Sequence, residues 1–289
     1  MVDLKFSLLR GICQMPAYVA HEKGFFEQNG IRADLDIAAT AWLIPQKLAS
    51  GQSQFSVMPW TRVAAAEEEG LGLVLLAGSG CEEAAIVLRT GVAVDQVRKV
   101  AVPQRGGIKD LTAMGLIESL GWKDVELMRQ PSGDGAILAL VGQGADAASM
   151  VEPYATMLES LGIGTVIRRT ADLWPHSPGC SLTTNVRMIR EAPELVESVV
   201  SAFCRGSQYV EENPAEASEI ASHYIGVSAA FIRKALNHNR PNVAALRARA
   251  AMDDILRLML QLDYIRQLPS NYMNLSFLDR VTGRAGTAA

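Results

Sequence analysis

Short apolar runs alternate with longer amphipathic segments in the first part of the chain. Ile31 to Ile37 alternates apolar and polar residues, which is typical of a strand with one buried face. Phe55 to Met58 and Leu73 to Ala77 are continuous apolar runs, which are typical of strands buried on both faces. Helix-like segments separate these runs, so the pattern predicts a parallel sheet with crossover helices.

The same alternation restarts near Ala84 and continues to the turn-rich segment Trp174 to Gly179. It predicts a second block, with strands at residues 85–88, 99–102, 125–128, 145–151 and 165–167. An extended segment at 181–186 follows the break. Beyond Met188 the periodicity is almost entirely helical, and it predicts one continuous helix over 243–265. We therefore expect two α/β blocks in series, followed by C-terminal helices.

The size and composition of the chain agree with two blocks. At 289 residues the chain is near the length at which a single core stops growing, so two lobes are expected. Hydrophobic residues make up 49% of the chain, which is enough for two sizeable cores. The net charge of −4 argues against nucleic acid and anionic membranes as partners, because both attract basic proteins.

The first residues contain one short apolar run, Phe6 to Leu9, which Ser7 interrupts. This run is too short for the core of a signal peptide or for a membrane span, so we expect no direct membrane insertion. Two locations agree with it. The protein is periplasmic if a leader has been removed, and otherwise cytoplasmic.

Four cysteines are scattered along the chain: Cys13, Cys81, Cys180 and Cys204. None of them stands in a CxxC or Cys/His ligand spacing, so the sequence predicts neither a zinc site nor a disulfide framework. The GxGxxG, GxSxG and HExxH motifs are absent, and the histidines are isolated. The sequence therefore indicates no cofactor and no familiar catalytic motif.

Candidate ligand-binding residues lie where predicted strands end, because ligands of open α/β sheets bind at the carboxyl edge. Cys13, Gln14 and Met15 follow the first strand and precede a helix whose first N–H groups can attract an anion. Cys13 is either a nucleophile or a small, buried, inert thiol. In the next such loop Thr40 either caps a helix or donates to a ligand, and Trp42 follows it.

Two strand ends carry a matching sequence. Met58-Pro59-Trp60 ends a strand of the first block, and Glu152-Pro153-Tyr154 ends one of the second. If the blocks face each other, Trp60 and Tyr154 can grip a flat or apolar part of a ligand; the alternative is ordinary packing at a helix start. Arg62 either binds a carboxylate or sulfonate or lies on a solvated helix face.

Two glycine-containing turns complete the candidate site. Ser79 lies between two glycines at the end of a buried strand. Arg105, Gly106 and Gly107 precede the helix predicted over 108–120, where backbone amides and the arginine can hold an anion. The alternative for this segment is a plain glycine turn.

Several of these segments resemble one known family. Residues 16–31, PAYVAHEKGFFEQNGI, resemble the first helix and turn of the nitrate, sulfonate, taurine and thiamine-precursor binding proteins. GQGADA at 142–147, followed by Glu152-Pro153-Tyr154, resembles their second-lobe strand and loop. The helix at 106–121 and NPAE at 213–216 also agree with the family. The resemblance extends from residue 4 to about residue 225.

This resemblance implies a type II periplasmic-binding-protein fold. Lobe one would consist of residues 1–83 and 185–289, and lobe two of residues 84–184. Two hinge strands, near 84–88 and 181–184, would join the lobes in opposite directions. Cys81 and Cys180 would then lie at opposite ends of this pair, so we predict no bond between them.

The resemblance also implies a function. Members of the family are solute-binding proteins of ABC transporters, which close by hinge motion around a small molecule. This chain would bind a sulfonate, a carboxylate or a pyrimidine-like molecule and would present it to an ABC permease. The candidate binding residues are those at the strand ends and turns described above.

A sulfinate desulfinase of the same superfamily suggests an alternative. That enzyme has a nucleophilic cysteine in the first strand–helix loop and an arginine in a following block, and Cys13 and Arg62 are similarly placed. Its catalytic histidine has no counterpart, since His21 is the only histidine between these two residues and belongs to the first predicted helix. The sequence therefore favours binding, with a cysteine-dependent desulfinase or decarboxylase as the alternative.

Overall fold

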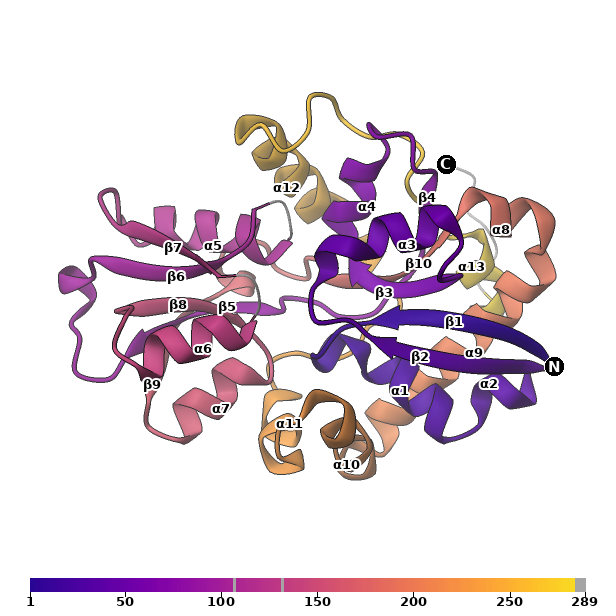
Figure 1. The fold of residues 1–289 in the computed structure, drawn as a ribbon, viewed down its shortest axis with the longest axis horizontal. Coiled ribbons are helices and arrows are strands. Elements are labelled where there is room, and N and C mark those ends of the chain that lie inside the picture. Colours follow the sequence, from indigo (N-terminus) through magenta and orange to yellow (C-terminus); the bar gives the residue numbers. More distant parts are fainter. Residues whose placement is uncertain (106–107, 131–132, 284–289) are drawn as a thin grey trace.

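The computed structural model describes residues 1–105, 108–130 and 133–283, and its strands form two five-stranded sheets (Figure 1). The first sheet has the order β2-β1-β3-β10-β4. Its strands are β1 (Val2–Leu8), β2 (Ile31–Ile37), β3 (Phe55–Pro59), β4 (Leu73–Gly78) and β10 (Cys180–Asn185). β1 pairs in parallel with β2 and β3, whereas β10 is antiparallel to β3 and β4.

The second sheet repeats this plan with the order β7-β6-β8-β5-β9. Its strands are β5 (Ala84–Arg89), β6 (Lys99–Pro103), β7 (Glu126–Gln130), β8 (Ala147–Val151) and β9 (Gly164–Arg169). β6 is parallel to β7 and β8, and β5 is antiparallel to β8 and β9. In each sheet the fourth strand in the order therefore runs against the others. The α/β architecture predicted from the apolar runs is confirmed, with one antiparallel strand in each sheet.

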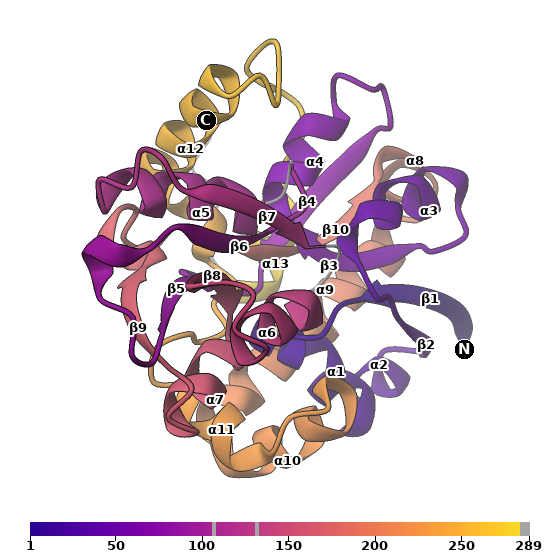
Figure 2. The same cartoon turned by 60° about the vertical axis from the view of Figure 1, so that its left-hand side comes forward.

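Helices cover both sheets, as Figures 1 and 2 show from two directions. The first seven are α1 (Met15–Glu22), α2 (Phe25–Gln28), α3 (Ile44–Ser50), α4 (Trp60–Ala66), α5 (Ile108–Ser119), α6 (Gly133–Val141) and α7 (Tyr154–Ser160). The C-terminal helices are α8 (Val186–Glu191), α9 (Pro193–Glu212), α10 (Pro214–Ile225), α11 (Ala229–Ala235), α12 (Arg249–Gln261) and α13 (Ser276–Thr282). No helix in the described ranges is long and apolar enough to cross a bilayer.

The C-terminal helices contact both halves of the molecule. α9 packs along α1 beneath the first sheet, while α11 contacts α7 and α12 contacts α5 beside the second (Figure 1). The core under the first sheet includes Phe6, whose ring lies 5.4 Å from that of Phe55 and 4.8 Å from that of Phe26. This arrangement buries the apolar stripe of the long helix α9 and fixes the position of the strand ends above it.

The chain passes between the two sheets twice, and the two passages lie side by side. The backbone N–H of Ser79 donates to the carbonyl of Cys180 at 3.1 Å, and Cys81 lies opposite Pro178 in an antiparallel bridge. The passages therefore fall at residues 79–83 and 177–180. The hinge strands were predicted a few residues later, near 84–88 and 181–184. Those segments instead belong to β5 and β10, which lie in different sheets.

This correction changes the expected relation between two cysteines. Cys81 and Cys180 do not lie at opposite ends of a strand pair, since the residue opposite Cys81 is only two positions from Cys180. Both are free thiols in the structure, as are Cys13 and Cys204. The prediction that Cys81 and Cys180 form no disulfide is tested by counting the free thiols of the protein.

The long C-terminal helix predicted by periodicity begins later than expected, at Arg249. The backbone N–H of Asn242 donates to the carbonyl of Ser79 at 3.0 Å, so this part of the chain pairs with the extension of β4. A 3₁₀ turn follows before α12 starts. Tertiary pairing overrides helical periodicity here, and the later helix α13 was not predicted.

Candidate ligand-binding site

A cavity of about 260 Å³ is lined by residues from the carboxyl ends of six strands. Three of them, β1, β2 and β3, belong to the first sheet, and β6, β7 and β8 belong to the second. Within each sheet these three strands are parallel, so their carboxyl ends meet at one edge. The two edges together enclose a space that suits a small organic molecule.

Three cationic side chains line this cavity: Arg10, Arg62 and Lys109. Arg10 directly follows β1, Arg62 is on α4 and Lys109 is in the first turn of α5. None of the three makes an ion pair within the part of the chain that the structure describes. The described part of the lining therefore has an excess of positive charge.

Arg62 is the most confined of the three cations. Its Nε is buried and has no hydrogen-bond partner among the described residues, and its guanidinium lies 5.1 Å from the centre of the Trp42 ring. Burial lowers the pKa of Arg62, and the nearby Asp110 opposes that shift. The ordinary pKa of arginine lies so far above neutral pH that Arg62 stays charged, so this burial leaves a poorly solvated cation facing the cavity.

Asp110, the one carboxylate among the described residues of the lining, is engaged elsewhere. It is fully buried, forms an ion pair with Arg129 and accepts a hydrogen bond from the Tyr264 hydroxyl. Burial and the neighbouring Asp110 carboxylate raise the pKa of Tyr264 to about 12, so Tyr264 stays protonated and keeps donating at neutral pH. Asp110 therefore does little to neutralise the three lining cations.

The rest of the lining combines a few polar atoms with apolar walls. Ser149, in β8, has a buried hydroxyl without a hydrogen-bond partner among the described residues. Tyr154, at the start of α7, borders the cavity and is 7% exposed. Pro59 and Val151 supply apolar surface from opposite sheets. Such a mixture positions an organic body beside a charged group.

The structure brings only some of the predicted binding residues together. Thr40, Arg62 and Tyr154 line the cavity. The Thr40 hydroxyl also accepts the backbone N–H of Trp42 at 3.4 Å, so it caps the short 3₁₀ turn before α3. Trp42 and Arg105 line a neighbouring surface groove that Arg62 also reaches. Gly106 and Gly107 lie outside the described residues.

Four other predicted residues are buried in the protein. Gln14 accepts the backbone N–H of Leu9 at 3.2 Å, and Met15 lies in the core. The Ser79 hydroxyl donates to the carbonyl of Cys13. Trp60 is fully buried, and its Nε1 donates to the carbonyl of Pro178 at 2.9 Å. The contacts of these side chains hold the strand ends in place.

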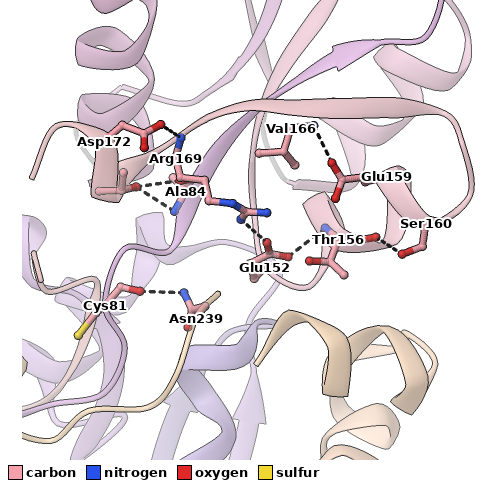
Figure 3. Close-up of polar contacts among 11 residues, drawn as sticks. Cys81, Ala84, Glu152, Thr156, Glu159, Ser160, Val166, Arg169, Asp172 and Asn239 are labelled. Atoms are coloured by element: carbon pink, nitrogen blue, oxygen red, sulfur yellow. Dashed lines mark hydrogen bonds and ion pairs between the residues drawn. The ribbon is translucent and has the colours of Figure 1, made fainter. Parts of the chain in front are cut away.

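Glu152 is held by neighbours within the second half of the molecule, as Figure 3 shows. One carboxylate oxygen lies 2.8 Å from the guanidinium of Arg169, and the other accepts the backbone N–H of Thr156 at 3.0 Å. The side chain is almost completely buried. Its carboxylate therefore fixes the start of α7 against β9.

Cys13 lies in a small closed space behind the cavity, together with Glu83 and Cys180. The Gln14 amide donates to the Cys13 sulfur at 3.2 Å, and the Cys180 thiol points at a Glu83 oxygen 3.5 Å away. A hydrogen bond with Cys13 and complete burial raise the pKa of the Cys180 thiol well above its ordinary value. Cys13 and Arg62 thus line different spaces.

A larger concavity of about 970 Å³ lies between the end of α9, α11 and the loop that follows α11. Its lining mixes acidic residues such as Glu82 and Glu211 with basic ones such as Arg233 and Lys234. Among the described residues, no carboxyl end of a strand contributes to it. The smaller cavity is therefore the candidate ligand site, because parallel strand ends and cations without an ion pair in the described ranges coincide there.

Sequence reasoning missed several lining residues. Arg10 follows β1 at once, so the rule that ligands bind at strand ends was sufficient to identify it. Lys109 lies two residues beyond Gly106 and Gly107, which were predicted to hold an anion. Ser149 lies inside an apolar run, where no local signal marks it, because its role depends on which strand edges meet.

The family model described as NMT1/THI5 like matches residues 13–217, which is well over half of the chain. The chain belongs to the NMT1/THI5-like family. The family resemblance of the sequence is thereby confirmed. Among curated protein sequences, none matches this NMT1/THI5-like protein significantly.

Solved structures share its fold at low identity. The periplasmic nitrate-binding protein NrtA from Synechocystis PCC 6803 is 14% identical with a TM-score of 0.85, covering 100% of this chain and 90% of NrtA. The alkanesulfonate-binding protein SsuA from Xanthomonas axonopodis pv. citri, bound to MOPS, is 14% identical with a TM-score of 0.78, covering 94% and 96%. The desulfurization enzyme DSZB is 16% identical with a TM-score of 0.74, covering 98% and 99%. These similarities confirm the periplasmic-binding-protein fold.

Proposed function

We propose that this NMT1/THI5-like protein is a solute-binding protein that encloses one small organic anion in the 260 Å³ cavity. The observation that carries the proposal is Arg62, a largely buried guanidinium that has neither an ion pair nor a hydrogen bond within the described residues. An anionic ligand would form charge-assisted hydrogen bonds with it and would compensate its lost hydration. Arg10 and Lys109 would add to the attraction.

The lining also suggests the class of ligand. Tyr154, Pro59 and Val151 offer apolar surface, which an inorganic anion would leave unused. A sulfonate, a carboxylate or a phosphorylated pyrimidine would place its charged group near Arg62 and its body against these walls. SsuA with MOPS and NrtA as a nitrate-binding protein agree with anion binding in this fold.

We further propose that the two sheets belong to two lobes that move about the paired passages. Because β10 (Cys180–Asn185) is a strand of the first sheet, the lobes would be residues 1–83 with 180–289, and residues 84–179, so the second boundary lies earlier than the one predicted from the resemblance. Both lobes supply cavity walls, so closure around a ligand would exclude water and would signal occupancy. In an importer the partner that reads this signal is an ABC permease, and the protein would then act in the periplasm.

A thermal-shift screen with matched pairs tests the charge requirement. Methanesulfonate and acetate would each be compared with the neutral amide of the same shape, and nitrate and a pyrimidine phosphate would extend the panel. We expect stabilisation by at least one organic anion and by none of the neutral partners, because only ligands that bind the folded state raise its melting temperature. A panel without any shift would count against the binding role.

Arg62→Met tests the residue that carries the proposal. Loss of a buried charge-assisted contact should weaken binding of the best anion by about 30- to 1000-fold, or about 2–4 kcal/mol, measured by isothermal titration calorimetry. The ligand-free melting temperature should fall little, because Arg62 has no ion pair or hydrogen bond among the described residues and loses only its contact with the exposed Trp42 ring and its attraction to Asp110. Arg257→Met, on the exposed face of α12, is the matched control and should change neither quantity. Equal affinity in both variants would refute the role of Arg62.

The alternative function is a desulfinase or decarboxylase that uses Cys13 and Arg62. The reason to consider this alternative is that the desulfurization enzyme DSZB has a similar fold. Against it, Cys13 is buried in a small space that adjoins the cavity, whereas Arg62 lines the cavity itself, so one substrate would have to reach past the shared wall to contact both. Cys13→Ser separates the two functions: binding should persist in this variant, and turnover of a sulfinate by the wild type that the variant lacks would establish the enzyme.

A further inference from the structure

Three potential metal ligands meet behind the wall of the cavity. They are the Sγ atoms of Cys13 and Cys180 and a carboxylate oxygen of Glu83, and these atoms lie within 4.8 Å of one another. All three residues are buried. They come from the loop after β1 and from both passages between the sheets, so they are far apart in sequence.

The carboxylate of Glu83 has no cationic partner within 4 Å among the described residues. One oxygen accepts the backbone N–H of Cys180 at 2.7 Å, and the other lies 3.5 Å from the Cys180 sulfur. A carboxylate that is 6% exposed and has no ion pair among the described residues is costly to bury. A divalent cation at this position would compensate that cost.

A second observation points to a ligand in the same space. Asn239 also lines it and is 1% exposed. Its amide nitrogen donates to the carbonyl of Cys81 at 3.0 Å, as Figure 3 shows. Its Oδ1 has no hydrogen-bond partner among the described residues. An orphaned, buried acceptor beside two thiols and a carboxylate is a fourth potential donor atom.

Two glycines allow Glu83 to fold inward. A Cβ at Gly80 would lie 2.5 Å from a Glu83 carboxylate oxygen and 2.8 Å from the Cβ of Cys13. A Cβ at Gly179 would clash with the Glu83 carboxylate directly. Both passages therefore have glycine where any side chain would push the carboxylate away from the two sulfurs.

We propose that Cys13, Glu83 and Cys180 bind one thiophilic divalent metal ion of the Zn²⁺ type, with Asn239 Oδ1 available as a fourth ligand. Tetrahedral zinc at about 2.3 Å from each thiolate places two sulfurs about 3.8 Å apart, which is compatible with three donor atoms that lie within 4.8 Å of one another. Both thiols lose their protons to solvent on binding, and no oxidation takes place. Two thiolates favour such an ion over Mg²⁺ or Ca²⁺.

The surroundings agree with this charge balance. Two thiolates, one carboxylate and a divalent ion leave one negative charge, and Lys109 and Arg10 line the same space. The Gln14 amide donates to the Cys13 sulfur and would hold a metal-bound thiolate in place. The ion would fasten both passages to the first loop of the first sheet, directly behind the proposed ligand cavity. The proposed metal site does not depend on which small molecule binds in the cavity.

Cobalt substitution tests the site on the full-length protein. Protein stripped with a chelator under reducing conditions would be titrated with Co²⁺ and then with Zn²⁺. We expect one ion per chain, a thiolate-to-cobalt charge-transfer band, bleaching of that band by Zn²⁺ and a higher melting temperature. Absence of the band, or uptake without any change in the cobalt spectrum, would overturn the proposal. So would a wild-type protein that forms a Cys13–Cys180 disulfide but takes up no metal.

Variants locate the ion. Cys13→Ser and Cys180→Ser should each weaken Co²⁺ binding by at least about 100-fold, and Glu83→Gln by about 10- to 100-fold. Cys204→Ser is the matched control, since this thiol lies on α9 outside the cluster and should leave binding unchanged. Gly179→Ala keeps every ligand but displaces Glu83, so it should behave like Glu83→Gln. Arg62→Met should retain full metal uptake, which separates failure of this proposal from failure of the ligand-binding one.

Discussion

The ends of β3 and β8 have matching sequences but different surroundings. In each, a proline directly precedes the aromatic residue that starts the next helix, Trp60 in α4 and Tyr154 in α7. Trp60 is fully buried and its ring lies 6.3 Å from that of Tyr272. Tyr154 borders the proposed ligand cavity. The same local sequence therefore forms part of a core in one half and part of a cavity wall in the other.

The difference comes from a distant part of the chain. The segment around Tyr272 runs beside β4, where its backbone carbonyl accepts the N–H of Leu75 at 2.8 Å, and it covers the first strand end. Tyr154 is also largely buried, but it follows Glu152 with its ion pair to Arg169 and borders the cavity. The end of a strand thus fixes the position of the residue that follows it. Segments from later in the sequence determine whether its side chain is buried in a core or faces the cavity.

Trp60→Ala should have the largest effect on stability. Removing a fully buried indole costs about 3–5 kcal/mol of unfolding free energy, and the hydrogen bond to Pro178 is lost as well. Trp42→Ala is the matched control, because Trp42 is 59% exposed and should cost less than about 1 kcal/mol. Urea unfolding measures both. Similar costs for the two tryptophans would contradict the buried position of Trp60.

Arg169→Met should have the next largest effect, at the second strand end. It would leave the buried carboxylate of Glu152 without its cation, which we expect to cost about 2–3 kcal/mol because Arg169 itself is partly exposed. Met58 occupies the equivalent position in β3 as a buried apolar residue and needs no such partner. The neighbouring Arg168→Met removes an exposed arginine and should be nearly neutral. A comparable loss in both variants would argue against the pair.

Much of the fold was readable from the sequence because strands and helices leave local periodic signals. The run from Ile31 to Ile37 coincides with β2, and the apolar run beginning at Phe55 becomes β3. The antiparallel placement of β5 and β10 was not readable, since it depends on how the two sheets exchange strands. The late start of α12 was not predictable either, because it depends on the pairing of Asn242 with the distant Ser79.

The candidate site was less predictable than the fold. Arg62 was predicted because it lies two residues beyond Trp60, where its guanidinium can offer several donors to a carboxylate or sulfonate, and it lines the cavity. The Cys13–Glu83–Cys180 cluster has no sequence spacing that indicates a metal, because its members come from three separate segments. Cysteine spacing detects sites within one loop, whereas this cluster exists only once the two passages are paired.

The smallest predicted effect concerns Tyr154 itself. Tyr154→Leu keeps most of the apolar volume but removes the flat ring, so affinity for the best organic anion should fall about 3- to 10-fold, or about 0.5–1.5 kcal/mol. Its unfolding free energy should change by less than about 1.5 kcal/mol. Tyr272→Leu is the counterpart at the first strand end, where it should lower stability through the lost contact with Trp60 and leave affinity unchanged. Calorimetric titration and urea unfolding of both variants measure these quantities. If Tyr272→Leu weakened binding as much as Tyr154→Leu, the two strand ends would share the ligand, and the contrast between core and cavity wall would be wrong.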